Sequence, residues 1–252
     1  MKGSNITECI ARFVNASGPS KKTRAAREDV MGLFNSYLAN YGEIASNVER
    51  APLIVTAPIS DLGPFHFRQF LSWYVIQKVM DRDKGRYAPV LRDFAKWLVE
   101  SKAIGNKVAA EILVALSELQ GEPERCEKLA ELLYKFANRD MPTFQDYQND
   151  PKSYAKKATV LKAIHHEKPQ RMLDGYFIVA RVGPAALWLN PELADEEDDD
   201  SEPGDSSKIE IGPVQIPPEA AALARVGDRI SAAIGEMSGF WKLLETGGVY
   251  PS

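Results

Sequence analysis

Cysteine and histidine are scarce in this 252-residue chain, which has two cysteines and three histidines. Cys9 and Cys126 are far apart in the sequence, and neither has a partner at the spacing of a metal-binding pair. Structural zinc sites take their ligands from closely spaced cysteines and histidines, and disulfide frameworks need more cysteines. The sequence therefore predicts no metal site, no cofactor and a reduced protein of the cytoplasm.

Long apolar runs are also missing. No stretch approaches the roughly 20 apolar residues of a membrane-spanning helix, and the N-terminal sequence MKGSNITECIARF lacks the apolar centre of a secretion signal. We therefore expect no membrane partner. With 44% apolar residues, the chain has enough for one hydrophobic core or two small ones.

The motifs of common enzyme classes are absent. There is no phosphate-binding loop, dinucleotide-binding glycine motif, hydrolase nucleophile elbow or paired-histidine metalloprotease motif. His165 and His166 are adjacent, so on a helix their side chains would point about 100° apart and would not share a metal ion. The sequence predicts no catalytic residue, and an enzyme built from scattered carboxylates is kept as a third hypothesis.

The acidic residues are concentrated in one segment. Nine acids and no base lie between residues 192 and 205, and a run this dense repels itself and does not fold alone. Residues 1–191 carry 27 Lys+Arg against 21 Asp+Glu, a net charge of +6. We interpret residues 191–206 as a solvated acidic loop. The alternative is that the run competes with nucleic acid for the basic part of the chain, or docks a partner.

Apolar residues recur every three or four positions through the first 140 residues, which predicts helices. The first is expected near residues 24–41, and Asp61 is expected to cap the second. Short connections favour antiparallel neighbours, so we predict a helical bundle over residues 24–140 after an N-terminal segment, 1–23. The expected apolar stripes are Val30, Leu33, Phe34, Tyr37, Leu38 and Tyr41; Phe67, Phe70, Leu71, Tyr74 and Ile76 or Val79; Val90, Leu91, Phe94, Trp97 and Leu98; Val108, Ile112, Leu113, Leu116 and Leu119; and Leu129, Leu132, Leu133 and Phe136.

The last 80 residues or so have a different composition. Segments 175–189, 209–217 and 225–251 are rich in β-branched and aromatic residues and contain glycine turns, which is typical of short strands. About five strands at this spacing predict a small barrel or bent sheet over residues 173–252. Residues 141–172 would be a basic linker. The predicted fold class is α+β, with an N-terminal SAM-like helical bundle followed by a small β-barrel-like domain that bears the acidic loop.

The segment from Ile59 to Ile104 contains two amphipathic helices joined by a basic turn. Its ordered motifs are ISDL at 59–62, FLSW at 70–73 and LRDFAKWL at 91–98. Together with the neighbouring helices, over residues 24–137, they resemble the core-binding domain of phage-integrase-type tyrosine recombinases. The resemblance implies a SAM-like four-helix module that clamps duplex DNA. One departure is Pro89, which shortens a helix that contacts DNA in the family. The family's catalytic arginines, histidine and tyrosine are not matched.

Basic residues on this module and in the linker are the candidate DNA contacts, because each Lys or Arg that neutralises a phosphate releases counterions. The interleaved aromatics are interpreted as core, and Trp73 and Trp97 are the exceptions because each lies at the margin of its stripe. The predicted nucleic-acid-binding residues are Arg68, Lys78, Arg82, Lys84, Arg86, Arg92, Lys96, Lys156 and Lys157.

Near the C-terminus, Gly239-Phe240-Trp241 followed by Gly247-Gly248-Val249-Tyr250-Pro251 is weakly similar to SH3-like barrels. That similarity implies a groove for a protein partner, with Trp241 and Tyr250 as its candidate residues. The other interpretation is that both side chains fill the barrel core.

These patterns predict a non-catalytic, DNA-binding accessory or regulatory protein whose partner is duplex DNA. The second hypothesis is a protein–protein interaction adaptor that does not bind DNA and holds its partner through the β domain. No small-molecule cofactor is expected under either hypothesis.

Overall fold

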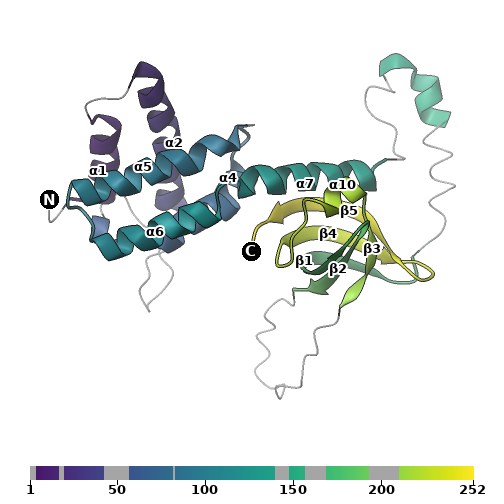
Figure 1. The fold of residues 1–252 in the computed structure, drawn as a ribbon. Helices are drawn as coiled ribbons and strands as arrows, with labels where there is room; N and C mark the ends of the chain where they lie inside the picture. Colours follow the sequence, from purple (N-terminus) through teal and green to yellow (C-terminus); the bar gives the residue numbers. More distant parts are fainter. Residues whose placement is uncertain are drawn as a thin grey trace. The chain divides into compact units, whose positions relative to one another are not determined.

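The chain forms two compact units, a helical unit of residues 1–124 and a barrel unit of residues 125–252 (Figure 1). The α+β fold class is confirmed, since helices make up the first unit and a five-stranded barrel the second. Within the residues that the structure describes, no helix combines the length and the apolar character needed to cross a membrane. This computed structural model describes residues 4–16, 20–42, 57–81, 83–139, 148–156, 169–192 and 210–252.

The predicted helices of the helical unit are observed close to their expected positions. The second one starts at Pro64, after Gly63, and not at Asp61, which lies in a separate turn of 3-10 helix. The expected Asp61 cap is therefore wrong, because proline is favoured in the first helical turn and sets the start. The elements are α1 (Ile6–Val14), α2 (Lys21–Asn40), η1 (Ile59–Asp61), α3 (Pro64–Gln69), the π-helical η2 (Phe70–Tyr74), α4 (Val75–Lys78), η3 (Lys84–Arg86), α5 (Tyr87–Glu100) and α6 (Asn106–Glu118).

Helix α1 lies in the segment that was expected to precede the bundle. Asn5 caps it, because its side chain accepts a hydrogen bond from the Glu8 backbone N–H at 2.7 Å, while the Glu8 carboxylate accepts one from the Asn5 N–H at 3.4 Å. This is a capping box, whose spacing is visible in the sequence. Cys9 and Phe13 of α1 are fully buried in the core. The bundle therefore begins at Ile6.

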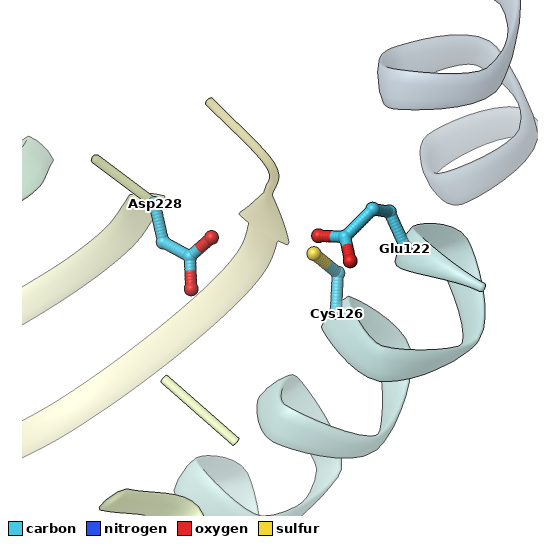
Figure 2. A group of neighbouring side chains, drawn as sticks. All are labelled: Glu122, Cys126 and Asp228. Carbon is cyan, nitrogen blue, oxygen red and sulfur yellow. The ribbon is translucent and has the colours of Figure 1, made fainter. Parts of the chain in front are cut away.

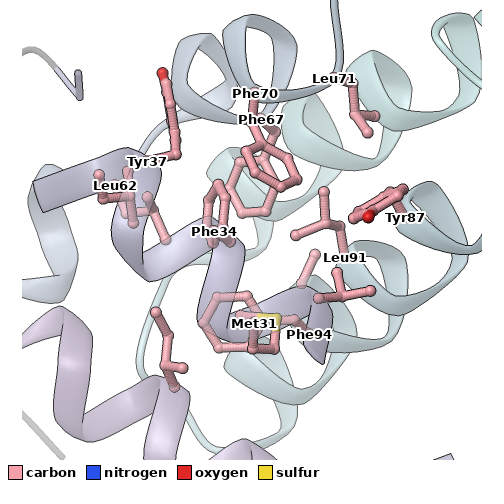
Figure 3. Close-up of a cluster of buried hydrophobic side chains, with 14 of the residues drawn as sticks. Met31, Phe34, Tyr37, Leu62, Phe67, Phe70, Leu71, Tyr87, Leu91 and Phe94 are labelled. Carbon is pink, nitrogen blue, oxygen red and sulfur yellow. The ribbon is translucent and has the colours of Figure 1, made fainter. Parts of the chain in front are cut away.

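Aromatic side chains from α1, α2, α3, η2 and α5 form the centre of this core, and Figure 3 shows Phe34, Phe67, Phe70 and Phe94 among them. Phe34 lies 5.0 Å from Phe67 and 5.1 Å from Phe70, between ring centroids, and Phe13 lies 5.2 Å from Phe94. All five are buried, and burying a phenylalanine side chain stabilises a fold by roughly 1.5–3 kcal/mol. The predicted margin residues Trp73 and Trp97 are both only partly buried against this core.

The boundary between the two units falls in the first turn of α7, earlier than the expected boundary at residue 140. The buried Cys126, Leu129 and Leu133 of this helix therefore belong to the barrel unit. The elements of this unit are α7 (Glu122–Ala137), β1 (Met172–Gly183), β2 (Ala186–Pro191), β3 (Ile211–Gln215), α10 (Pro218–Ala221), β4 (Arg229–Glu236) and β5 (Trp241–Tyr250).

The five strands close into a barrel in the order β1-β2-β3-β5-β4. β3 and β5 are parallel and the other pairs are antiparallel. The chain crosses over between β3 and β4, so β4 pairs with β1 and not with β3. This crossover makes the barrel a Greek-key arrangement and not a simple meander. The inward-facing residues are alternate ones, including Phe177, Val179, Leu187, Leu189, Ile230, Ile234, Leu243 and Val249.

Candidate nucleic-acid interface

Several basic residues predicted to contact DNA are engaged within the helical unit. Arg68 forms an ion pair with Glu118. Arg86 lies between two carboxylates, 2.6 Å from Asp81 and 3.4 Å from Asp29. These acids offset the positive charge that a phosphate would otherwise meet.

Lys84 differs from the other candidates because it is buried, with 3% of its surface exposed. Its Nζ donates a hydrogen bond to the backbone carbonyl of Ile76 at 3.4 Å. A buried ammonium group is not available to a ligand on the surface. Lys84 is therefore a structural residue of the helical unit, and we remove it from the candidate interface.

The remaining basic candidates have varied surroundings. Arg92 donates a hydrogen bond to Gln120 at 2.6 Å, and the Lys78 ammonium lies 5.9 Å from the centroid of Trp73. Lys96 and Lys156 are exposed. Arg82 and Lys157 lie outside the described residues.

Trp241 and Tyr250, the predicted partner-binding residues, are both buried, with 7% and 9% of their surfaces exposed. Burial also raises the pKa of the Tyr250 phenol. These exposures agree with the interpretation that the two side chains help to fill the barrel, and they leave little ring surface for a protein ligand.

The structure reveals three arginine clusters in the barrel unit that the sequence analysis did not identify. Each contains an arginine that stacks on an aromatic ring and also pairs with a glutamate. The guanidinium carbon of Arg171 lies 5.1 Å from the Trp241 ring centroid, and its nitrogen lies 3.3 Å from the Glu236 carboxylate. For Arg181 the same two distances are 3.6 Å to Trp188 and 2.8 Å to Glu210. For Arg229 they are 3.9 Å to Tyr176 and 2.6 Å to Glu192.

Strand β1 connects the three arginine clusters. Tyr176 and Arg181 lie on β1, and Arg171 directly precedes it. The pairing register of β1 with β2 shifts between Val179 and Arg181, leaving Ala180 as an extra residue. Such a bulge changes the face to which the following side chains point. It places Arg181 opposite Trp188, on the outside of the barrel.

The glutamates that pair with these arginines can be replaced by the anionic group of a ligand. The Arg181 and Glu210 side chains are 55% and 42% exposed, and an exposed ion pair of this kind contributes only about 0–1 kcal/mol. A phosphate offers a guanidinium stronger, bidentate hydrogen bonds. An anionic ligand can therefore displace the glutamate without a large loss of stability. The rings of Trp188 and Tyr176, which are not buried, are then available for stacking.

One of these clusters was within reach of sequence reasoning. A glycine turn is expected within segment 175–189. A two-residue loop at 184–185 pairs Gly183 with Ala186 and so places residue 181 opposite residue 188. The sequence does not show the shift in the pairing register. Without the bulge at Ala180, strict alternation along β1 would place Tyr176 and Arg181 on opposite faces of the strand.

A buried polar cluster lies where α7 meets the turn before β4 (Figure 2). The Cys126 sulfur lies within 4.8 Å of an oxygen of Asp228, and Glu122 precedes Cys126 by four residues on the same helix. The Asp228 carboxylate accepts hydrogen bonds from Arg125 at 2.7 and 2.8 Å and from the Arg225 backbone N–H at 2.8 Å. Its negative charge is therefore already compensated by a guanidinium, which favours a structural role over metal binding.

No protein-family model, no curated protein and no solved structure matches the chain. The candidate interface is therefore supported by the geometry of its own residues.

Proposed function

We propose that this protein is a non-catalytic, DNA-binding accessory protein and that the outer surface of its barrel supplies the main contacts. The observation that carries the proposal is the set of three arginine clusters, in which a guanidinium lies against an aromatic ring in each case. Arginine for phosphates together with aromatic rings for bases is the combination that nucleic-acid-binding surfaces use. A location in the cytoplasm is part of the same proposal.

The helical unit has a supporting role in this proposal. Its recombinase-like motifs resemble a DNA-clamping module, but Arg68 and Arg86 are paired with acids and Lys84 is buried. The exposed Lys96 supplies additional positive charge. We therefore place the stronger contacts on the barrel.

A salt titration tests the proposal. Fluorescence anisotropy of a labelled DNA duplex and of its separated strand is measured with the full chain at several salt concentrations. Each phosphate contact contributes about 0.7–0.9 to the slope of log K against log salt. Replacing Arg171, Arg181 and Arg229 with glutamine is therefore expected to flatten the slope by as much as about 2–3.

A matched triple variant in the helical unit locates the contacts. Replacing Arg68, Lys78 and Lys96 with glutamine removes the same charge and is expected to flatten the slope less. The opposite ranking would place the interface on the helical unit. If neither form of DNA binds at low salt, the proposed function is wrong.

The adaptor hypothesis is supported by a different observation. A hollow of about 410 Å³ lies between α3 and α6, lined by Pro64, Arg68, Ala110, Glu111 and Val114. Val114 is 54% exposed and the neighbouring Phe65 is 49% exposed, and exposed apolar side chains beside a hollow are typical of protein-binding surfaces. A protein ligand that uses this surface should be lost on Val114→Glu, while the DNA titration stays unchanged.

A further inference from the structure

Trp188 occupies a position that is shaped by two glycines on the neighbouring strands. Its flanking residues Leu187 and Leu189 are buried in the barrel, so Trp188 points outward. A Cβ added to Gly183 on β1 would lie 2.9 Å from the indole ring, and a Cβ added to Gly212 on β3 would lie 2.6 Å from it. The ring therefore lies directly against the backbone, in a position that only glycine neighbours permit.

Arg181 covers this ring. Its guanidinium carbon lies 3.6 Å from the ring centroid, the shortest such distance of the three arginine clusters. A second contact, to Glu210 at 2.8 Å, holds the guanidinium. A nucleotide can substitute for both contacts of Arg181. Its phosphate can take the place of the Glu210 carboxylate, and its base can take the place of the guanidinium on the Trp188 indole.

We infer that the cluster of Arg181, Trp188 and Glu210 is a nucleotide site for single-stranded nucleic acid. A phosphate takes the place of Glu210 at Arg181, the guanidinium turns toward it, and an unpaired base stacks on the uncovered face of Trp188. In a duplex the faces of the bases are occupied by their neighbours, so this site selects unpaired strands. The inference rests on the proposed function and names the form of nucleic acid that the barrel binds.

Variants of the cluster separate a binding role from a structural one. Base stacking on an aromatic side chain contributes enough that Trp188→Ala should weaken binding of a single strand of about 16 nucleotides by about 5- to 150-fold. Trp188→Phe keeps a ring and should lose less. Glu210→Gln removes the anion that competes for Arg181 and should tighten binding severalfold, an effect that damage to the fold would not produce.

Tyr134→Ala is the matched control, because Tyr134 is an aromatic residue of the same unit that is 58% exposed. It is expected to leave the affinity unchanged. Binding is measured by anisotropy with labelled oligothymidylate and with the corresponding dT·dA duplex, and circular dichroism verifies folding. If Trp188→Ala does not fold, Trp188→Phe and Glu210→Gln still decide the question.

The outcomes distinguish the inference from the proposed function. Tighter binding of the single strand, with the expected effects of both variants, supports the inference. Equal binding of the two forms, or no effect of Trp188→Phe and Glu210→Gln, overturns it while the DNA-binding function stands. No binding of either form at low salt overturns both.

Discussion

Arg125 holds the Asp228 carboxylate through two hydrogen bonds, from Nη1 to Oδ2 at 2.8 Å and from Nη2 to Oδ1 at 2.7 Å. Both side chains are buried, with 9% and 1% exposed. Arg125 also donates to the carbonyl of Leu223 at 2.8 Å. The pair therefore attaches helix α7 to the chain segment that leads from α10 into β4.

Removing one partner of this ion pair is expected to be severe. Arg125→Ala leaves the Asp228 carboxylate buried without its guanidinium, and breaking a buried pair in this way costs about 3–5 kcal/mol. Denaturant unfolding of the barrel unit, followed by circular dichroism, measures the loss. Lys128→Ala, at an exposed position on the same helix, is the control and should change stability by less than about 0.5 kcal/mol. Equal stability of the two variants would contradict the role assigned to the pair.

The helices were predictable because their signals are local. The apolar stripe around Phe34 gives the helical period of α2, and Gly63 followed by Pro64 marks the start of α3, each within a few residues of sequence. The Greek-key order of the strands depends on pairs such as Met172 with Gly235, and the Arg125–Asp228 pair joins residues 103 positions apart. Local patterns carry no information about such contacts. The same limit applied to the basic residues, because nothing in the sequence near Arg68 indicates that Glu118 will lie against it.

Replacing glycine with alanine is expected to have opposite effects on stability at Gly212, beside Trp188, and at Gly32, in helix α2. In Gly212→Ala the new Cβ would lie 2.6 Å from the indole of Trp188 and 2.9 Å from the carbonyl oxygen of Leu187, so the barrel should lose about 1–3 kcal/mol. Gly32→Ala lies at an exposed position within α2, where nothing lies within 4 Å of the new Cβ. It should stabilise the helical unit by about 0.5–1 kcal/mol. Thermal unfolding of both variants measures the two signs.

A shift in Trp188 fluorescence should accompany the loss in Gly212→Ala, because the ring is forced from its position. The Gly32→Ala protein is expected to keep the wild-type emission spectrum. If Gly212→Ala proves as stable as wild type and its spectrum is unchanged, the indole does not lie where the structure places it.

The thiol of Cys9 should be unreactive in the folded protein. Its side chain is fully buried in the helical unit, and burial raises its pKa, so both access and the thiolate population are reduced. Cys126 is also buried, and the two cysteines do not form a disulfide. With Ellman's reagent, neither thiol should react before unfolding and both should react in denaturant. Ser117→Cys, at an exposed position on α6, should react at once, and rapid reaction of the wild-type protein would contradict this prediction.

Tyr250 predicts a loss of stability at alkaline pH. Burial raises its pKa in the folded barrel above the ordinary tyrosine value of about 10, so the unfolded chain ionises first. The contribution of Tyr250 is fully present below about pH 10 and is lost as the pH rises through its raised pKa. Tyr250→Phe should therefore reduce the alkaline loss of stability, as measured by unfolding at a series of pH values. Tyr134→Phe, at an exposed position, should leave the profile unchanged.

Neutralising the acidic run should change the affinity for DNA while the arginine clusters stay intact. Glu192 at its start pairs with Arg229 at 2.6 Å, so the variant should retain Glu192 and replace only the acids from Asp195 to Asp205 with their amides. If these acids compete with phosphates for the barrel, the variant should bind DNA more tightly at low salt. The difference should shrink at high salt, because ions screen exposed charges. A control that replaces the same number of exposed acids elsewhere shows whether the effect follows net charge alone. Unchanged affinity at low salt would show that the run does not compete with DNA, and would leave solvation as its role.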